Sequence, residues 1–286
     1  MCKDEYLKFN TIIKDLFKTT NPLYEEQFVY HYTNLSSLLS IIENKELWLS
    51  ERNCMNDVND EKFIKDFLTH FSDNSSPIAT NIISQLLDLI IPNEHQYVFS
   101  TSKEEDSIHQ WTYYGSNDSV CITFDRQALI DTFGDFFNWN KFYYGSIFYT
   151  KTFDKDSETK ETIYTVLSNY LRTSFLFKSA ESNRNISDEY KKVFEYCYSL
   201  VKQQEHYCEK EYRFSVIPES AVVYFRERKG LIVPYIKVKI EPKKVISKIK
   251  IGPNNKEPMT EKNLRFFLEA NKFDNIPIDY SNMVIR

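Results

Sequence analysis

The stretch FVYHYTNLSSLLSIIENKELWLS, residues 28–50, carries two hydrophobic periods one after the other. Its first residues, 28–32, are mostly aromatic and β-branched, which predicts a short strand. Leucine and isoleucine then recur every three or four positions from Leu35 to Ile42, which predicts an amphipathic helix. Residues 46–50, ELWLS, predict a second strand. The stretch therefore predicts a strand–helix–strand unit.

Three side chains with polar groups, His31, Tyr32 and Thr33, lie where the first strand passes into the helix. Side chains at such a junction can cap the helix or line a ligand cleft. Thr33 and Asn34 both carry an oxygen that can accept a hydrogen bond from a free amide of the first turn, and we expect Thr33 to be the cap. A cap does not explain the imidazole and the phenol beside it, so we favour a cleft that all three residues line.

The composition of the 286 residues, 42% hydrophobic and 27% charged, is that of a globular protein long enough to bury a core. Only 5 residues are Gly, and no GxGxxG or GxxxxGK[ST] string occurs, which argues against a glycine-rich phosphate loop. The net charge of −5 provides no global basic field for nucleic acid, although a local strip at residues 237–250 could offset it.

The cysteines and the hydropathy pattern bear on the cellular compartment. The 5 cysteines are isolated and form no CxxC pair, which is typical of reduced thiols. The N-terminus has no apolar signal-peptide core, and no apolar run reaches the ~20 residues of a membrane span. We therefore expect a soluble cytoplasmic protein without a membrane partner.

Segments with strand and helix periods follow one another without a regular βαβ rhythm. This predicts a single α+β domain over residues 1–286 with a mixed or antiparallel sheet. Residues 1–27 are expected to form a helical extension, and residues 155–207 a helical insertion. The further expected strands are 96–102, 119–125, 141–150, 211–217, 221–228, 231–240 and 245–253. The further expected helices are 4–18, 60–71, 79–91, 159–177, 188–205 and 260–272, with a short one ending at Gly115.

The segment HYCEKEYRFSV, residues 206–216, alternates charged and apolar positions. A strand that starts at Cys208 would place Glu209, Glu211 and Arg213 on one face and apolar side chains on the other. Burying two carboxylates and a guanidinium is costly unless they are paired. The charged face is therefore either a solvated surface with a Glu–Arg pair or the wall of a cleft, and the sequence leaves both open.

Two other strings contain candidate binding residues. FSTS places Ser100 and Ser102 on one strand face, where two hydroxyls can line a polar pocket or simply end the strand. HQWTYY places Trp111 and Tyr114 on a short helix, where large aromatic side chains pack in a core more often than they stack on a ligand.

Several classes of chemistry lack their motifs. The acidic loop at residues 56–61 contains Asp57 and Asp60 but lacks the glycine of an EF-hand, so a solvated loop is the default. No HxxxH or HExxH zinc motif, no GxSxG elbow and no recognisable cysteine nucleophile occurs. Carboxylates, a histidine, hydroxyls and aromatic rings remain, and they favour glycosidic-type chemistry without a metal or a covalent nucleophile.

Three blocks of the sequence resemble a bacterial family classified as domain of unknown function 2971. They are YHYTNLSSLLSIIENKELWLS…MND near the start, FSTSKEEDSIHQWTYYG…VCITFD in the middle and EKEYRF…IGP…IDYSNMVIR at the end. The blocks run in this order from about residue 28 to Arg286. This resemblance implies relatives but no reaction.

A more distant resemblance is to the ADP-ribosyltransferases, in particular the toxin-like enzymes that modify nucleic acid. In that superfamily a first-strand His or Arg binds the NAD ribose, a middle strand often reads Ser-Thr-Ser, and a later strand carries Glu-x-Glu. YHYT at 30–33, STS at 100–102 and EKE at 209–211 are similar. This chain departs from the pattern because it has His31 where enzymes with the other two motifs normally have Arg, and because the interval between the second and third motifs is far longer than usual.

The resemblance implies an ADP-ribosyltransferase-like fold and an enzyme that cleaves the nicotinamide–ribose bond of NAD, with NAD as substrate, no metal, and a nucleic acid or protein as acceptor. A role as a toxin or phage-defence effector fits it. Such cleavage passes through an oxocarbenium-like transition state, which a carboxylate stabilises. The implied roles are catalysis by Glu211, Glu209 and His31, binding of ribose or carboxamide by His31 and Thr33, support of the glutamate by Ser100 beside Ser102, stacking by Tyr32, Trp111 or Tyr114, and pyrophosphate binding by Arg213.

Three other functions stay open at this point. Transfer to water would make the protein an NAD glycohydrolase. A metal-dependent nuclease could use Asp57, Asp60, Glu209 and Glu211 around two ions. The aromatic-rich cleft could also belong to a non-catalytic module that senses or binds a nucleotide.

Overall fold

A computed structural model describes residues 26–55, 95–114, 117–150, 195, 199–255, 257–273 and 275–284. Several predictions fall outside these residues: the helices at 4–18, 60–71, 79–91 and 159–177, the side chains of Asp57 and Asp60, and most of the N-terminal extension and of the insertion. Within the described part of the chain, no helix is long and apolar enough to cross a membrane.

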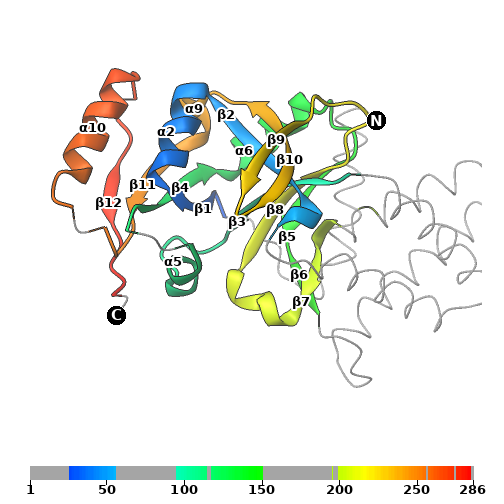
Figure 1. Cartoon of the computed structure of the whole chain (residues 1–286), viewed down its shortest axis with the longest axis horizontal. Helices are drawn as coiled ribbons and strands as arrows, with labels where there is room; N and C mark the ends of the chain where they lie inside the picture. Colours follow the sequence, from blue (N-terminus) through cyan, green and yellow to red (C-terminus); the bar gives the residue numbers. More distant parts are fainter. Residues whose placement is uncertain are drawn as a thin grey trace, which may run out of the picture.

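One large sheet of ten strands organises the described residues (Figure 1). Its strands are β1 (Phe28–Asn34), β2 (Glu46–Glu51), β3 (Tyr97–Ser102), β4 (Ser119–Asp125), β5 (Phe142–Ser146), β8 (Glu211–Val216), β9 (Tyr224–Arg228), β10 (Leu231–Lys239), β11 (Ile246–Ile251) and β12 (Ile278–Tyr280). The order is β12-β11-β4-β1-β3-β2-β10-β9, and β8 also pairs with β3 and carries β5 on its other edge. All of these pairs are antiparallel except β11 with β12, so the predicted α+β fold with a mixed, mainly antiparallel sheet is confirmed.

Short helices connect and cover the strands. They are α2 (Leu35–Asn44), α5 (Ile108–Tyr114), α6 (Arg126–Phe136), α9 (Pro242–Val245), α10 (Thr260–Ala270) and two 3-10 helices, η1 (Arg52–Cys54) and η2 (Gln204–Glu209). A second sheet consists of β6 (Phe148–Thr150) and β7 (Val201–Gln203), which are parallel. Figure 1 shows α10 beside β12 at one end of the molecule and α5 below β1.

The opening strand–helix–strand unit forms as predicted, but its cap is Asn34 rather than Thr33. The Asn34 carboxamide oxygen accepts a hydrogen bond from the Ser37 amide at 2.8 Å. Because β1 continues through Asn34 and the helix begins at Leu35, the residue with the extended N-cap conformation is Asn34. Thr33 therefore does not cap the helix.

The sheet divides at β3. One edge of β3 pairs with β8 along its whole length. The other edge is shared, because β1 pairs only at Ser102 and β2 only at Tyr97 and Val98. In the described part of the chain, residues 99–101 face no strand on this edge. We call this division of the sheet between β1 and β2 the fork.

Alternation along β3 and β8 separates a core face from a polar face. Phe99 and Phe214 lie in the main hydrophobic core, where Phe133 of α6 packs against both with ring centroids 5.8 and 5.3 Å away. Ser100 and Arg213 are paired directly across the two strands and lie on the opposite face. The predicted alternation is confirmed for both strands.

Other elements differ from the predictions. Helix α6 was not expected, although Asp125 caps it by accepting from the Ala128 amide at 2.8 Å. The expected strand 141–150 is interrupted at Ile147, and residues 201–203 form β7 instead of the end of a helix. Strand β8 begins at Glu211 rather than Cys208, because η2 occupies residues 204–209 and Lys210 has a left-handed conformation with φ 47°.

Candidate functional site

A pocket of about 560 Å³ opens at the fork. Residues from β1 and the start of α2 line one side, β2 and β9 line another, and β3, α5, η2 and β8 complete it. Because no strand of the described part of the chain pairs with residues 99–101 on this edge, the pocket reaches the middle of β3. The fork is therefore what creates the pocket.

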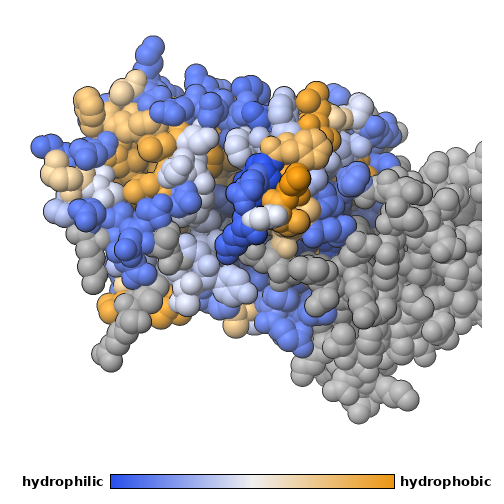
Figure 2. Space-filling view, in the orientation of Figure 1, coloured by the Kyte–Doolittle hydropathy of each residue, from blue (hydrophilic) through white to orange (hydrophobic). Residues whose placement is uncertain are grey.

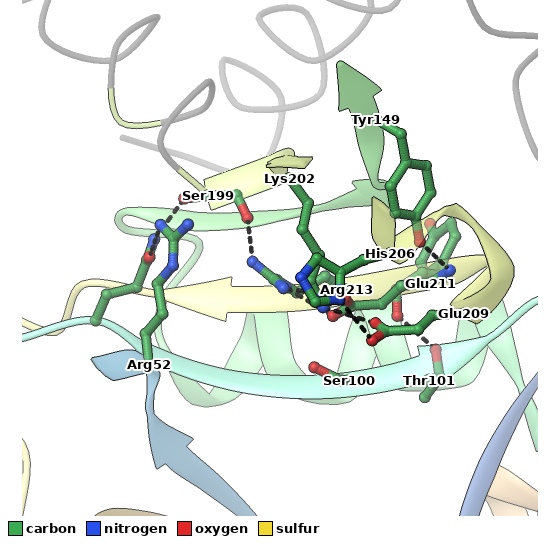
Figure 3. Close-up of polar contacts among 12 residues, drawn as sticks. Arg52, Ser100, Thr101, Tyr149, Ser199, Lys202, His206, Glu209, Glu211 and Arg213 are labelled. Atoms are coloured by element: carbon green, nitrogen blue, oxygen red, sulfur yellow. Dashed lines mark hydrogen bonds and ion pairs between the residues drawn. The ribbon is translucent and has the colours of Figure 1, made fainter. Parts of the chain in front are cut away.

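A buried ion pair lies at one end of this pocket. Arg213 donates from Nε to Glu211 Oε1 at 2.7 Å and from Nη2 to Glu211 Oε2 at 3.0 Å. The two residues are two positions apart on β8, so their side chains share a face, and each is only 4% exposed. Arg213 also donates from Nη1 to the carbonyl of Ser199 at 3.2 Å. Figure 3 shows the guanidinium alongside the Glu211 carboxylate.

Lys202 joins a second carboxylate to this pair. Its ammonium lies 2.6 Å from Glu209 Oε2 and 3.6 Å from Glu211 Oε2. His206 Nδ1 lies 3.4 Å from the other oxygen of Glu209. Figure 3 shows Lys202 reaching from β7 toward both carboxylates. The predicted proximity of Glu209 and Glu211 is therefore present, although Glu209 reaches the cluster from η2 and not from the strand.

Glu211 is ionised despite its burial. Burial by itself raises the pKa of this carboxyl, but the charges of Arg213 and Lys202, the hydrogen bonds from Arg213 and the Ser100 hydroxyl together outweigh burial and lower the pKa to about 2. Ser100 lies opposite Arg213 on the adjacent strand, which places its hydroxyl on the same face. The site thus contains a fixed negative charge at neutral pH.

His31 lies at the free edge of β3. Its Nδ1–H donates to the carbonyl of Ser100 at 3.0 Å, and its ring stacks on Phe99 with centroids 4.7 Å apart. Burial lowers the pKa of the imidazole, and the hydrogen bond to Ser100 offsets only part of this effect. The neutral ring therefore has its second nitrogen, Nε2, available as an acceptor. His31 and Thr33 both line the pocket.

The prediction that Trp111 stacks on a ligand is wrong. Trp111 is fully buried and packs edge-on against Tyr32 with ring centroids 4.7 Å apart. Its indole nitrogen donates to Asp106 Oδ1 at 2.6 Å. Tyr32 borders the pocket, but its hydroxyl donates to the Glu104 carbonyl at 2.8 Å and accepts from the Ser107 amide at 2.9 Å. These two rings hold α5 against β1.

Tyr114 is the aromatic residue of α5 that lines the pocket, and it is 40% exposed. Partial burial, together with the charges of Glu209 and Glu211, raises the pKa of its hydroxyl to about 12. Ser102 and Gln110 hold the backbone of Glu209 in place, because their side chains both donate to its carbonyl, at 3.0 and 2.8 Å. These bonds fix the end of η2 and with it the Glu209 side chain.

The expected role of Arg213 in pyrophosphate binding also needs correction. Three of its nitrogens donate to Glu211 and Ser199, so the geometry assigns this guanidinium to the carboxylate. The pocket contains other cations that the sequence reading did not single out, Arg226 and Arg228 on β9. Their signal was present as alternation in YFRER, residues 224–228. Lys202 had no such signal, because its segment was expected to be helical.

No group of His, Cys, Asp and Glu side chains suited to a metal ion occurs among the described residues. Of the four carboxylates of the nuclease alternative, Asp57 and Asp60 lie outside the described residues, and Glu209 and Glu211 are bridged by Lys202. A metal ion between them would have to displace this ammonium.

Comparison with known proteins identifies one family. The family model described as "Protein of unknown function (DUF2971)" matches residues 110–214, from α5 through most of β8. This range includes Tyr114, Glu209, Glu211 and Arg213, and it supports the family resemblance over that part of the chain. No curated protein and no solved structure matches the chain.

Proposed function

We propose that this protein is an NAD-dependent enzyme of the ADP-ribosyltransferase type, which cleaves the nicotinamide–ribose bond in the pocket at the fork. One observation carries the proposal. His31, Ser100 and Glu211 come from three strands and line the same pocket: His31 donates to the Ser100 carbonyl, Ser100 lies directly across from Arg213, and Arg213 donates to Glu211. Residues of three strings that are far apart in the sequence thus line one pocket, which supports the proposal.

The proposed chemistry uses Glu211 as a fixed charge. The bond between ribose C1′ and the nicotinamide nitrogen breaks, and its electron pair leaves with the nicotinamide, which becomes neutral. Positive charge develops on the ribose, where the ionised Glu211 stabilises it. An acceptor nucleophile then bonds to C1′ and gives its proton to Glu209, whose side chain is 23% exposed.

The remaining pocket residues would bind and orient the substrate. His31 is held as a neutral ring, so Nε2 can accept a hydrogen bond from a ribose hydroxyl. Thr33 lines the same wall and, because Asn34 caps the helix, its hydroxyl is not needed there. Tyr114 offers a partly exposed ring on which the nicotinamide can stack.

Nicotinamide release from NAD tests this proposal. The purified protein is incubated with NAD, with and without a lysate that supplies nucleic acids and proteins. Release that requires the lysate supports transfer to a macromolecule, whereas release without it means that water is the acceptor and the protein is an NAD glycohydrolase. Glu209→Gln should slow transfer to the acceptor, while Glu261→Gln, at an exposed ion pair on α10, should leave it unchanged. No release under either condition would overturn the proposal.

A second candidate is a non-catalytic module that binds a nucleotide. The bidentate pair favours it, because Arg213 engages both oxygens of Glu211, which is typical of a structural ion pair. Such a module would bind NAD or ADP and release no nicotinamide with or without the lysate. Replacement of Glu211 would then lower the free energy of unfolding and change no reaction rate.

A further inference from the structure

Two arginines on the strand β9 line the same pocket as Glu211. Arg226 and Arg228 are two positions apart, so both side chains extend from the same face of the strand, and both line the pocket. Ser50 and Trp48 of β2 line it as well. Figure 2 shows a strongly hydrophilic strip next to a hydrophobic one over the β9–β10 hairpin.

The guanidinium of Arg226 is held in a defined orientation. Its Nη2 donates to Ser50 Oγ at 2.8 Å. Its central carbon lies 5.6 Å from the centre of the Trp48 ring and 5.7 Å from that of Tyr235, and these two rings contact each other with centroids 4.4 Å apart and planes tilted by 30°. Ordering of a long side chain costs conformational entropy. Because Arg226 is already ordered by these contacts, a ligand that binds it does not incur this cost.

Arg226 also retains unused capacity to bind an anion. Its Nε is buried and has no hydrogen-bond partner among the described residues. Burial lowers the pKa of Arg226 most, and repulsion by the neighbouring charge of Arg228 lowers it further. The nearby carboxylate of Glu46 is engaged by Lys237 and Lys239, at 3.5 and 2.7 Å. An anion with several oxygens would relieve this repulsion and satisfy the buried N–H.

The two ends of the pocket are within reach of one ligand. Tyr114 of α5 is affected by charges from both sides, since Glu209 and Glu211 raise the pKa of its hydroxyl and Arg228 lowers it. Arg228, Tyr114, Glu209 and Glu211 all line this pocket. A ligand with its reacting bond near Glu211 could place an anionic group at β9.

We propose that Arg226 and Arg228 form the subsite that binds the phosphate groups of a nucleotide, with Ser50 positioning Arg226. This inference deepens the proposed function and rests on it for the identity of the ligand's other half. For NAD, the diphosphate would lie against β9, and Arg213 would stay with Glu211.

Binding of ADP, inorganic pyrophosphate and adenosine to the full chain tests the subsite by calorimetry. The wild type should bind ADP and pyrophosphate, and adenosine at least about tenfold more weakly than ADP. Arg226→Gln and Arg228→Gln should each weaken ADP at least about tenfold and leave adenosine unchanged. Arg265→Gln removes an arginine from the exposed ion pair on α10 and should bind ADP as the wild type does.

Arg226→Lys is a second variant that is expected to fold, because it keeps the charge and most of the contact with Trp48 while removing the planar guanidinium. It should bind ADP with an affinity between those of wild type and Arg226→Gln. Equal affinity of ADP and adenosine, unchanged ADP binding in Arg226→Gln and Arg228→Gln, or no binding of ADP or pyrophosphate by the wild type would each overturn the subsite. Arginine-dependent ADP binding without nicotinamide release would retain the subsite and reject the proposed reaction. Nicotinamide release with an unchanged KM for NAD in both Arg226→Gln and Arg228→Gln would retain the proposed reaction and reject the subsite.

Discussion

At the scale of single residues, the site depends on how Glu211 is kept charged inside the protein. An isolated carboxylate at 4% exposure would take up a proton, because burial disfavours the charged form. Arg213 and Lys202 reverse this preference, and their positions are in turn fixed by the Ser199 carbonyl and by Glu209. The ion-pair network therefore orients the Glu211 carboxylate as well as keeping it ionised.

The pKa of Glu211 predicts how stability depends on pH. The folded pKa is about 2 and the reference value is 4.5, so the unfolded state binds a proton that the folded state does not. The contribution of this group is present above pH 4.5 and is lost as the pH falls toward 2. The difference in unfolding free energy between wild type and Glu211→Gln should therefore shrink over this window, as measured by urea denaturation. A difference that is constant with pH would contradict the ion-pair account.

Removal of Arg213 should destabilise the protein strongly. Arg213→Met would leave the buried Glu211 carboxylate without its main partner, at a cost of about 3 kcal/mol or more in unfolding free energy. Arg265→Met removes the same type of side chain from an exposed pair with Glu261 and should cost less than about 1 kcal/mol. Chemical denaturation of both variants measures the contrast, and similar small losses would mean that the buried pair is dispensable.

At the scale of elements, the predictable parts were those with a clear hydrophobic period. The unit from β1 to β2, strand β4 and the alternating faces of β3 and β8 follow directly from the sequence. Helix α6 was missed although Leu129, Ile130 and Phe133 have helical spacing, because Gly134 and the charged residues reduce the apparent amphipathicity. The position of Lys202 could not be predicted, because β7 has three residues and is defined by its pairing with β6.

The junction between β1 and α2 offers a direct test of the corrected cap. Asn34→Ala should lower the free energy of unfolding by about 1 kcal/mol, because it leaves the amide of Ser37 without its acceptor. Thr33→Ala at the preceding position should have a clearly smaller effect on stability. Thermal unfolding of the two variants decides between them, and the opposite order would restore Thr33 as the cap.

At the scale of the whole molecule, the site is a product of topology. Two strands that share one edge of β3 and then separate create the fork, and β8 on the other edge brings the carboxylates to the same pocket. The sequence predicted a cleft lined by His31, Ser100 and Glu211, and all three line the pocket, but it did not predict that β9 would line it too. Arg226 and Arg228 were visible as an alternating pair, yet their place in the pocket follows from the long-range pairing of β2 with β10.

Chelation should leave the reaction unchanged. Lys202 bridges Glu209 and Glu211, and Arg213 engages Glu211, so a metal ion would have to displace these side chains from the carboxylate oxygens. Nicotinamide release should therefore be equal before and after treatment with EDTA and unaffected by added Mg²⁺. Loss of activity with EDTA and its recovery with Mg²⁺ would favour the metal-dependent alternative.

The central claim is that Glu211 stabilises the transition state of nicotinamide–ribose cleavage, and the initial rate of nicotinamide release from NAD by Glu211→Gln tests it most directly. Glu261→Gln serves as the matched control, and circular dichroism verifies that both variants are folded. We predict a rate at least about 100-fold below wild type for Glu211→Gln and an unchanged rate for Glu261→Gln. A folded Glu211→Gln variant that releases nicotinamide as fast as the wild type would contradict the claim.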